Sequence, residues 1–165
     1  MCETRLIQKA TEVINQIKSE GHTLALAESC TGGWLSKIVT DVSGASSVYI
    51  GGICSYSNEV KMNLLGVKAE TLAQYGAVSE QTARQMATGV RNALKTDIGV
   101  GITGIAGPLS DNTHKPVGLI YVAVSFNDRV IVKELRNTFT EDIRTNNRAS
   151  AVETALNLLG DIYER

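Results

Sequence analysis

The sequence predicts a single α/β domain over residues 1–165, in which a mixed sheet is covered by helices, an α/β/α sandwich. Two observations lead to this prediction. Segments with strand character alternate with amphipathic helices early in the chain, and two further strand segments follow one another as a hairpin. Alternation favours parallel strands and a hairpin adds antiparallel ones, so we expect a mixed sheet.

The first half of the chain contains two helix patterns and two strand patterns. The first helix is expected to end near Gly21, and its apolar positions recur at helical spacing: Leu6, Ala10, Val13, Ile14 and Ile17. A strand follows over residues 22–27, and a second helix runs from Trp34 to about Asp41. Residues 42–46 read as a loop, and residues 48–56 as a second strand softened by two glycines.

The second half contains four further helices and three strands. Ser57 or Asn58 caps a helix that runs to Leu65, residues 69–75 form a short helix, and Ser79 caps a longer one. That longer helix presents one apolar face: Ala83, Met86, Ala87, Val90 and Leu94. The strands cover residues 97–103, 117–126 and 130–139, with a loop over 104–116 and a hairpin turn at 127–129. The last helix turns four residues inward: Val152, Leu156, Leu159 and Tyr163.

Composition excludes several classes of protein. The net charge is −1, so the electrostatic footprint of a nucleic-acid-binding protein is absent. No apolar run approaches the length of a membrane span, and the N-terminus lacks the apolar segment of a signal peptide. Three cysteines without CxxC spacing (Cys2, Cys30 and Cys54) argue against a disulfide framework and a structural zinc site, so we expect a cytoplasmic protein.

Histidine is scarce, which limits the kinds of catalytic site that the chain could build. Only His22 and His114 are present, so a Ser-His-Asp triad has few candidates. Any general base is therefore expected to be a lysine, a tyrosine or a carboxylate.

A serine stands at the turn between the first strand and the second helix, in Ala27-Glu28-Ser29-Cys30-Thr31-Gly32-Gly33. The first turn of a helix leaves backbone N–H groups unpaired, and glycine lets a ligand approach them. A hydroxyl beside free N–H donors is what acyl transfer requires. The alternative is structural: Ser29 caps the helix and the glycines pack closely against the sheet.

Two more strand ends carry polar or glycine-rich segments. In Ser55-Tyr56-Ser57-Asn58-Glu59-Val60-Lys61, Lys61 falls near the first turn of a helix, where the helix dipole and burial both disfavour its charged form. A neutral lysine can accept a proton from a serine hydroxyl. The structural alternatives are that Lys61 points into solvent and that Tyr56 lies on a face of the sheet. The third segment, residues 103–108, turns tightly and exposes N–H groups. Ligands of open α/β sheets lie beyond the carboxyl ends of the strands, where all three segments meet.

Five motifs resemble those of the CinA C-terminal domain family, and specifically its nicotinamide-nucleotide amidohydrolases. They are AESCTGG (27–33), YSNEVK (56–61), GAVSE (76–80), TGIAGP (103–108) and KPVG (115–118), in family order and at family spacing. The resemblance extends from about Leu6 to about Leu159 and implies the stand-alone form of the domain.

The resemblance implies that nicotinamide mononucleotide is hydrolysed to nicotinate mononucleotide and ammonia, without metal or cofactor, in pyridine-nucleotide recycling. Ser29 would be the nucleophile, Lys61 the base that activates it, and Tyr56 an assistant in that network. The remaining residues carried over would bind the substrate through the pocket wall or through backbone donors: Thr103, Gly104, Ala106, Gly107, Cys30, Thr31, Gly32 and Gly33. Some family members are dimers, so a homodimer is a further expectation.

Two segments depart from the family pattern. Residues 109–114 replace a glycine-rich loop, and the glycine of the usual Gly-Asp-Arg turn is absent before Arg144 and Arg148. Either arginine could pair with a substrate phosphate, and a solvated helix charge is the alternative for both.

Three rival interpretations remain at this point. Cys30 could replace Ser29 as the nucleophile, with a small buried residue as its structural alternative, whereas Ser55 and Ser57 have ready structural roles. The two departures also fit a domain that binds a pyridine nucleotide without turning it over. The family name alone suggests an interaction module in competence or DNA damage, although the near-neutral charge argues against direct DNA contact.

Overall fold

Five strands form one mixed sheet in the order β2-β1-β3-β4-β5 in the computed structural model, which describes residues 3–163. The strands are β1 (Leu24–Glu28), β2 (Tyr49–Cys54), β3 (Ile98–Gly104), β4 (Leu119–Phe126) and β5 (Arg129–Arg136). Strand β1 pairs in parallel with β2 and β3, whereas β4 runs antiparallel to both β3 and β5. The predicted mixed sheet is therefore confirmed.

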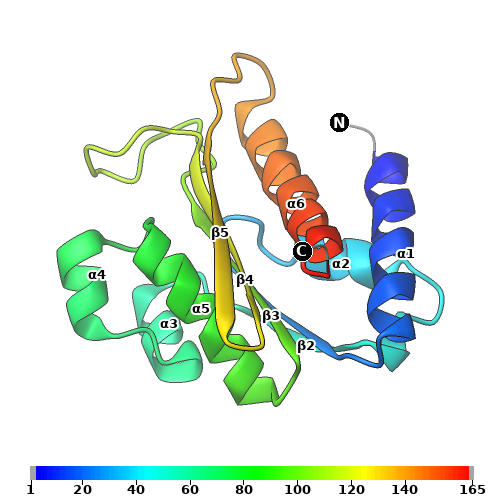
Figure 1. The fold of residues 1–165 in the computed structure, drawn as a ribbon. Helices are drawn as coiled ribbons and strands as arrows, with labels where there is room; N and C mark the ends of the chain where they lie inside the picture. The colour runs from blue at the N-terminus through cyan, green and yellow to red at the C-terminus, as the bar shows by residue number, and fades with distance from the viewer. Residues whose placement is uncertain (1–2, 164–165) are drawn as a thin grey trace.

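Helices cover both faces of this sheet, as Figure 1 shows. On one face lie α1 (Glu3–Ser19), α2 (Trp34–Thr40) and α6 (Ile143–Asp161). On the other lie α3 (Asn58–Leu65), α4 (Ala69–Tyr75) and α5 (Glu80–Leu94). The predicted α/β/α sandwich is confirmed in its layers and in the order of its elements.

The larger part of the core lies between the sheet and the layer of α1, α2 and α6. All five apolar positions predicted for the first helix are buried there. On the other face α5 approaches β3 very closely, because a Cβ atom at Gly101 would lie 2.5 Å from the carbonyl oxygen of Ala83. This close approach fixes β3, whose end contributes to the site described below.

The structure differs from the prediction mainly at the ends of elements. The hairpin turn comprises only Asn127 and Asp128, and Asn127 has φ 52°, which suits a tight two-residue connection. Strand β4 begins at Leu119 because Gly118, with φ 90°, reverses the chain there, and a Cβ atom at Gly118 would lie 2.1 Å from the carbonyl oxygen of Asn137. The predicted loop after α2 contains a short 3₁₀ helix, η1 (Ala45–Ser47).

Three chain segments leave the sheet at one edge, because β1, β2 and β3 are parallel neighbours. In register, Glu28 at the end of β1 pairs with Cys54 of β2 and with Ile102 of β3. The segments that follow these strands are the three that the sequence singled out. Over residues 3–163, no helix combines the length and the apolar character needed to cross a membrane.

Candidate active site

Ser29 lies directly after β1, in a turn that is held by backbone hydrogen bonds. Its amide donates to the carbonyl of Ile102 on β3 (3.1 Å), and its own carbonyl accepts from the amide of Gly32 (3.1 Å). Gly32 and Gly33 have φ values of 60° and 92°, a region that glycine adopts without strain. The turn therefore needs glycine at both positions before α2 begins at Trp34.

The carboxylate of Glu28 caps the N-terminus of α2, a role that the sequence analysis missed. It is 1% exposed and accepts hydrogen bonds from the amides of Gly33 (3.1 Å), Leu35 (3.1 Å) and Ser36 (2.8 Å) and from the Ser36 hydroxyl (2.7 Å). An anion at this end of a helix is favoured by the helix dipole. The signal was a carboxylate standing just before a glycine turn and a helix start.

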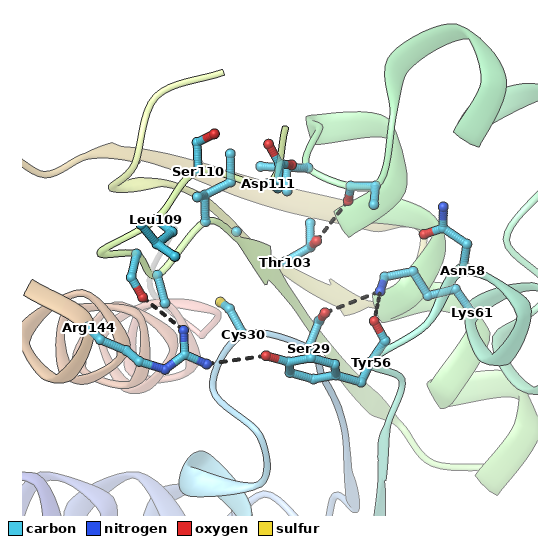
Figure 2. A pocket seen from close by; sticks show the side chains of 16 residues that line it. Ser29, Cys30, Tyr56, Asn58, Lys61, Thr103, Leu109, Ser110, Asp111 and Arg144 are labelled. Carbon is cyan, nitrogen blue, oxygen red and sulfur yellow. Dashed lines mark hydrogen bonds between the residues drawn. The ribbon is translucent and has the colours of Figure 1, made fainter. Parts of the chain in front are cut away.

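Lys61 reaches Ser29 from the first turn of α3, a helix that Ser57 caps by accepting from the Val60 amide (3.2 Å). The Lys61 side chain is buried, and its Nζ lies 3.1 Å from the Ser29 hydroxyl oxygen. The same nitrogen lies 2.7 Å from the Ser55 carbonyl oxygen and 3.5 Å from that of Tyr56. Figure 2 shows the hydrogen bonds that join Lys61 to Ser29 and to Tyr56. Burial lowers the pKa of Lys61 below its ordinary value.

The segment after β3 forms the next wall of the site. The Thr103 hydroxyl donates to the carbonyl of Ala77 (2.7 Å), which fixes the connection between α4 and α5 against the end of β3. Lys115 holds the same connection by donating to the carbonyls of Tyr75 and Val78. The GAVSE, TGIAGP and KPVG motifs are thus joined by hydrogen bonds.

These segments enclose a cavity of about 300 Å³, at the lower end of the range for small-molecule sites. Figure 2 shows the side chains around it. The lining residues are Ser29, Cys30, Tyr56, Asn58, Lys61, Ala77, Val78, Thr103, Gly104, Ile105, Ala106, Gly107, Leu109, Ser110, Asp111 and Arg144. Nine of the residues predicted for the site therefore line one cavity together: Ser29, Cys30, Tyr56, Lys61, Thr103, Gly104, Ala106, Gly107 and Arg144.

The two candidate arginines occupy different places. Arg144, in the first turn of α6, lines the cavity and donates to the Gly107 carbonyl (2.9 Å) and the Tyr56 hydroxyl (3.2 Å). Arg148 does not line it; its guanidinium donates to the carbonyl of Thr31 (2.7 Å) and lies over the Trp34 ring. The Tyr56 ring is largely exposed, and its hydroxyl bonds to Arg144 rather than to Lys61.

The predicted backbone donors of the turn are only partly available. Gly32 and Gly33 do not line the cavity, and their amides donate to Ser29 and Glu28, respectively. Within residues 3–163, neither the amide of Cys30 nor that of Thr31 donates to a backbone carbonyl. Thr31 is fully buried and does not line the cavity, so its amide is not accessible to a substrate.

Cys30 is placed differently from Ser29. Burial raises the pKa of its thiol to about 12, and the nearby Glu28 carboxylate acts in the same direction. Cys30 and Cys54 are free thiols, whereas Cys2 lies outside the described residues. A thiol with such a pKa is protonated at neutral pH, which makes it a poor nucleophile.

Some lining residues were not predicted. Asn58 and Val78 lie within quoted motifs, so motif membership was the available signal. Leu109, Ser110 and Asp111 come from the loop that departs from the family pattern. Among residues 3–163, no three histidine, cysteine or acidic side chains are grouped so that they could hold a metal ion.

Comparison with known proteins identifies the family of this chain. The CinA C-terminal domain family matches residues 7–163. A putative competence-damage inducible protein of Acetivibrio thermocellus is 58% identical over 114 residues, which cover 69% of this chain and 28% of that protein. A CinA-like protein of Kosmotoga olearia is 48% identical over 124 residues, 75% of this chain and 30% of the relative. The chain thus spans about 30% of the length of the curated relatives it matches.

Solved structures match nearly the whole chain. The competence/damage inducible protein CihA of Agrobacterium tumefaciens superposes with a TM-score of 0.88 at 37% identity, covering 96% of this chain and 94% of that one. A CinA superfamily protein of Escherichia coli superposes with a TM-score of 0.89 at 28% identity, covering 98% and 93%. The chain belongs to the CinA C-terminal domain family.

Proposed function

We propose that this protein hydrolyses the carboxamide of nicotinamide mononucleotide, with Ser29 as the nucleophile and Lys61 as its base. The observation that carries the proposal is the set of three partners around the Lys61 nitrogen: one hydroxyl at 3.1 Å and two carbonyl oxygens at 2.7 and 3.5 Å. A neutral amine has two N–H donors and one lone pair. The two carbonyls can take the donors, which leaves the lone pair for the Ser29 hydroxyl.

The depressed pKa supports this role. Burial lowers the pKa of Lys61, so a larger fraction is neutral near pH 7 than for an ordinary lysine. Ser29 then loses its proton to Lys61 as its oxygen bonds to the carboxamide carbon. The carbonyl oxygen becomes an oxyanion, and the amide of Cys30, which lines the cavity and donates to no backbone carbonyl, is the backbone donor that the turn offers to it.

The second half of the reaction returns the proton. The Lys61 ammonium gives it to the departing nitrogen, and ammonia leaves as the C–N bond breaks. Water then attacks the acyl group on Ser29 with Lys61 again as base, which releases the carboxylate and restores the hydroxyl. Arg144 is the cavity arginine, and its guanidinium is suited to the 5′-phosphate.

The direct test is incubation of the purified protein with nicotinamide mononucleotide, followed by measurement of ammonia and nicotinate mononucleotide. We expect both products in equal amounts, and we expect Ser29→Ala to lower the rate by roughly 10⁴- to 10⁶-fold. Ser46→Ala is the matched control, because Ser46 is an exposed serine of η1 away from the cavity. Full activity of Ser29→Ala would refute the nucleophile, and tight binding without ammonia would favour a binding or sensor domain.

A further inference from the structure

We infer that Glu28 and Arg148 are positioning residues that hold the turn after β1 so that the amide of Cys30 faces the oxyanion. This inference rests on the proposed function, because an oxyanion forms only if Ser29 attacks a carbonyl. It assigns to Arg148 a role other than binding phosphate. Neither side chain lines the cavity.

The turn is fixed at both of its ends. At the strand end, the Ser29 amide donates to Ile102 of β3. At the helix end, the Gly33 amide donates to the buried Glu28 carboxylate, which also holds the amides of Leu35 and Ser36. A carboxylate without protons accepts all of these bonds at once, whereas an amide in its place would turn an N–H toward one of them.

Arg148 fixes the middle of the turn from α6. Its guanidinium donates to the Thr31 carbonyl (2.7 Å), while the N–H of the same peptide, on Gly32, donates to the Ser29 carbonyl (3.1 Å). The peptide between Thr31 and Gly32 is therefore held by both of its polar groups. The Ser29 carbonyl that accepts the bond from Gly32 belongs to the peptide that carries the Cys30 amide.

The surroundings of Arg148 leave it little freedom to turn toward a substrate phosphate. Its guanidinium carbon lies 5.3 Å from the centre of the Trp34 ring, a favourable cation–π arrangement. Arg144, by contrast, lines the cavity, where it donates hydrogen bonds to the Gly107 carbonyl and the Tyr56 hydroxyl.

The first experiment measures labelling of Ser29 by a small fluorophosphonate, followed by intact mass, because this reaction needs the oxyanion donors but no substrate. We expect Arg148→Met to slow labelling by about 10²-fold, the usual effect of losing an oxyanion donor. Arg148→Lys restores part of the rate, since a lysine still donates one hydrogen bond to Thr31. Arg5→Met is the matched control, because Arg5 pairs with Glu153 of α6 at the surface (3.3 Å) and should label at the wild-type rate.

The second experiment separates positioning from phosphate binding. With nicotinamide mononucleotide and with nicotinamide riboside, which lacks the phosphate, Arg148→Met is expected to lower kcat for both and to leave KM unchanged. A rise in KM confined to the nucleotide, or labelling and kcat at wild-type rates, would overturn the inference.

Glu28 provides an independent variant if Arg148→Met does not fold. Glu28→Gln is expected to slow labelling, whereas Ser36→Ala, which removes only the hydroxyl bond and keeps the three amide bonds, is expected to label nearly normally. Equal rates in these two variants would contradict the role of Glu28. Labelling of the wild type without ammonia release would count against the proposed substrate alone.

Discussion

The turn at residues 29–33 and the loop at residues 109–113 both contribute to the cavity, but they are held in different ways. Ser29, Cys30 and Thr31 of the turn are buried, and the turn is bonded to the sheet, to Glu28 and to α6. The loop is exposed, and its side-chain hydrogen bonds are local: Ser110 accepts from the Asn112 amide and Asp111 from Thr113. Leu109 is 83% exposed at the cavity.

This difference suits the turn to the proposed chemistry and the loop to recognition of the ligand. Attack by a serine needs atoms that stay within hydrogen-bond reach of one another, so the proposed nucleophile and base come from rigid strand and helix ends. Recognition of the outer part of a ligand tolerates more variation, which is typical of surface loops. The departure of residues 109–114 from the family pattern falls on the exposed side.

The largest expected effect follows from removing the base on the rigid side. We predict that Lys61→Met lowers kcat/KM by roughly 10⁴-fold or more, because Ser29 keeps its proton. Amidase assays with nicotinamide mononucleotide, together with circular dichroism to verify folding, check this outcome. Retained activity in a folded variant would mean that another group accepts the proton.

Arg144 stands between the two regions, and its removal should affect binding more than chemistry. We predict that Arg144→Met raises KM for nicotinamide mononucleotide by about 10- to 100-fold, since a hydrogen bond to a charged group contributes roughly 1.5–3 kcal/mol. KM for nicotinamide riboside should change far less. An equal rise in KM for both substrates would indicate that Arg144 does not bind the phosphate and acts by positioning Tyr56 or Gly107.

A smaller effect is expected at Cys30, although it adjoins the nucleophile. Because burial raises the pKa of its thiol to about 12, we predict that iodoacetamide leaves it unmodified at neutral pH. We also predict that Cys30→Ala keeps activity within about tenfold, the cost of a small packing change. Loss of all activity in a folded Cys30→Ala variant would favour the cysteine as nucleophile.

The smallest effect is expected at the exposed end of the loop. We predict that Leu109→Ser changes the melting temperature and kcat very little, because an exposed side chain contributes within about 0.5 kcal/mol to stability. Only KM should respond, since Leu109 lines the cavity. A large fall in kcat would show that the loop takes part in the chemistry.

Sequence reasoning was most successful where local patterns decide the structure. Helical spacing predicted the buried face of α1. Residue type predicted caps at Ser57 or Asn58 and at Ser79, and the hydroxyls of Ser57 and Ser79 do accept from the amide three residues on. Parallel neighbouring strands made it possible to expect that Ser29 and Lys61 meet. Their roles in catalysis stay predictions.

Long-range contacts were beyond such patterns. No local signal relates Arg148 to Thr31, which are 117 residues apart, or Lys115 to the end of α4. The sequence left both Arg144 and Arg148 open between a phosphate partner and a solvated helix charge, and only the packing of α6 against the turn separates them. The same packing brings Arg144 to the Tyr56 hydroxyl, a contact that the sequence did not predict.

The central claim is that Lys61 takes the proton from Ser29, and the pH dependence of Ser29 labelling by a fluorophosphonate tests it most directly. The amine is active only when neutral, and burial lowers its pKa, so labelling should rise with pH and level off at a pH below the ordinary lysine value. Lys61→Met should label very slowly at every pH. Labelling of Lys61→Met at the wild-type rate, with the same pH dependence, would contradict the account.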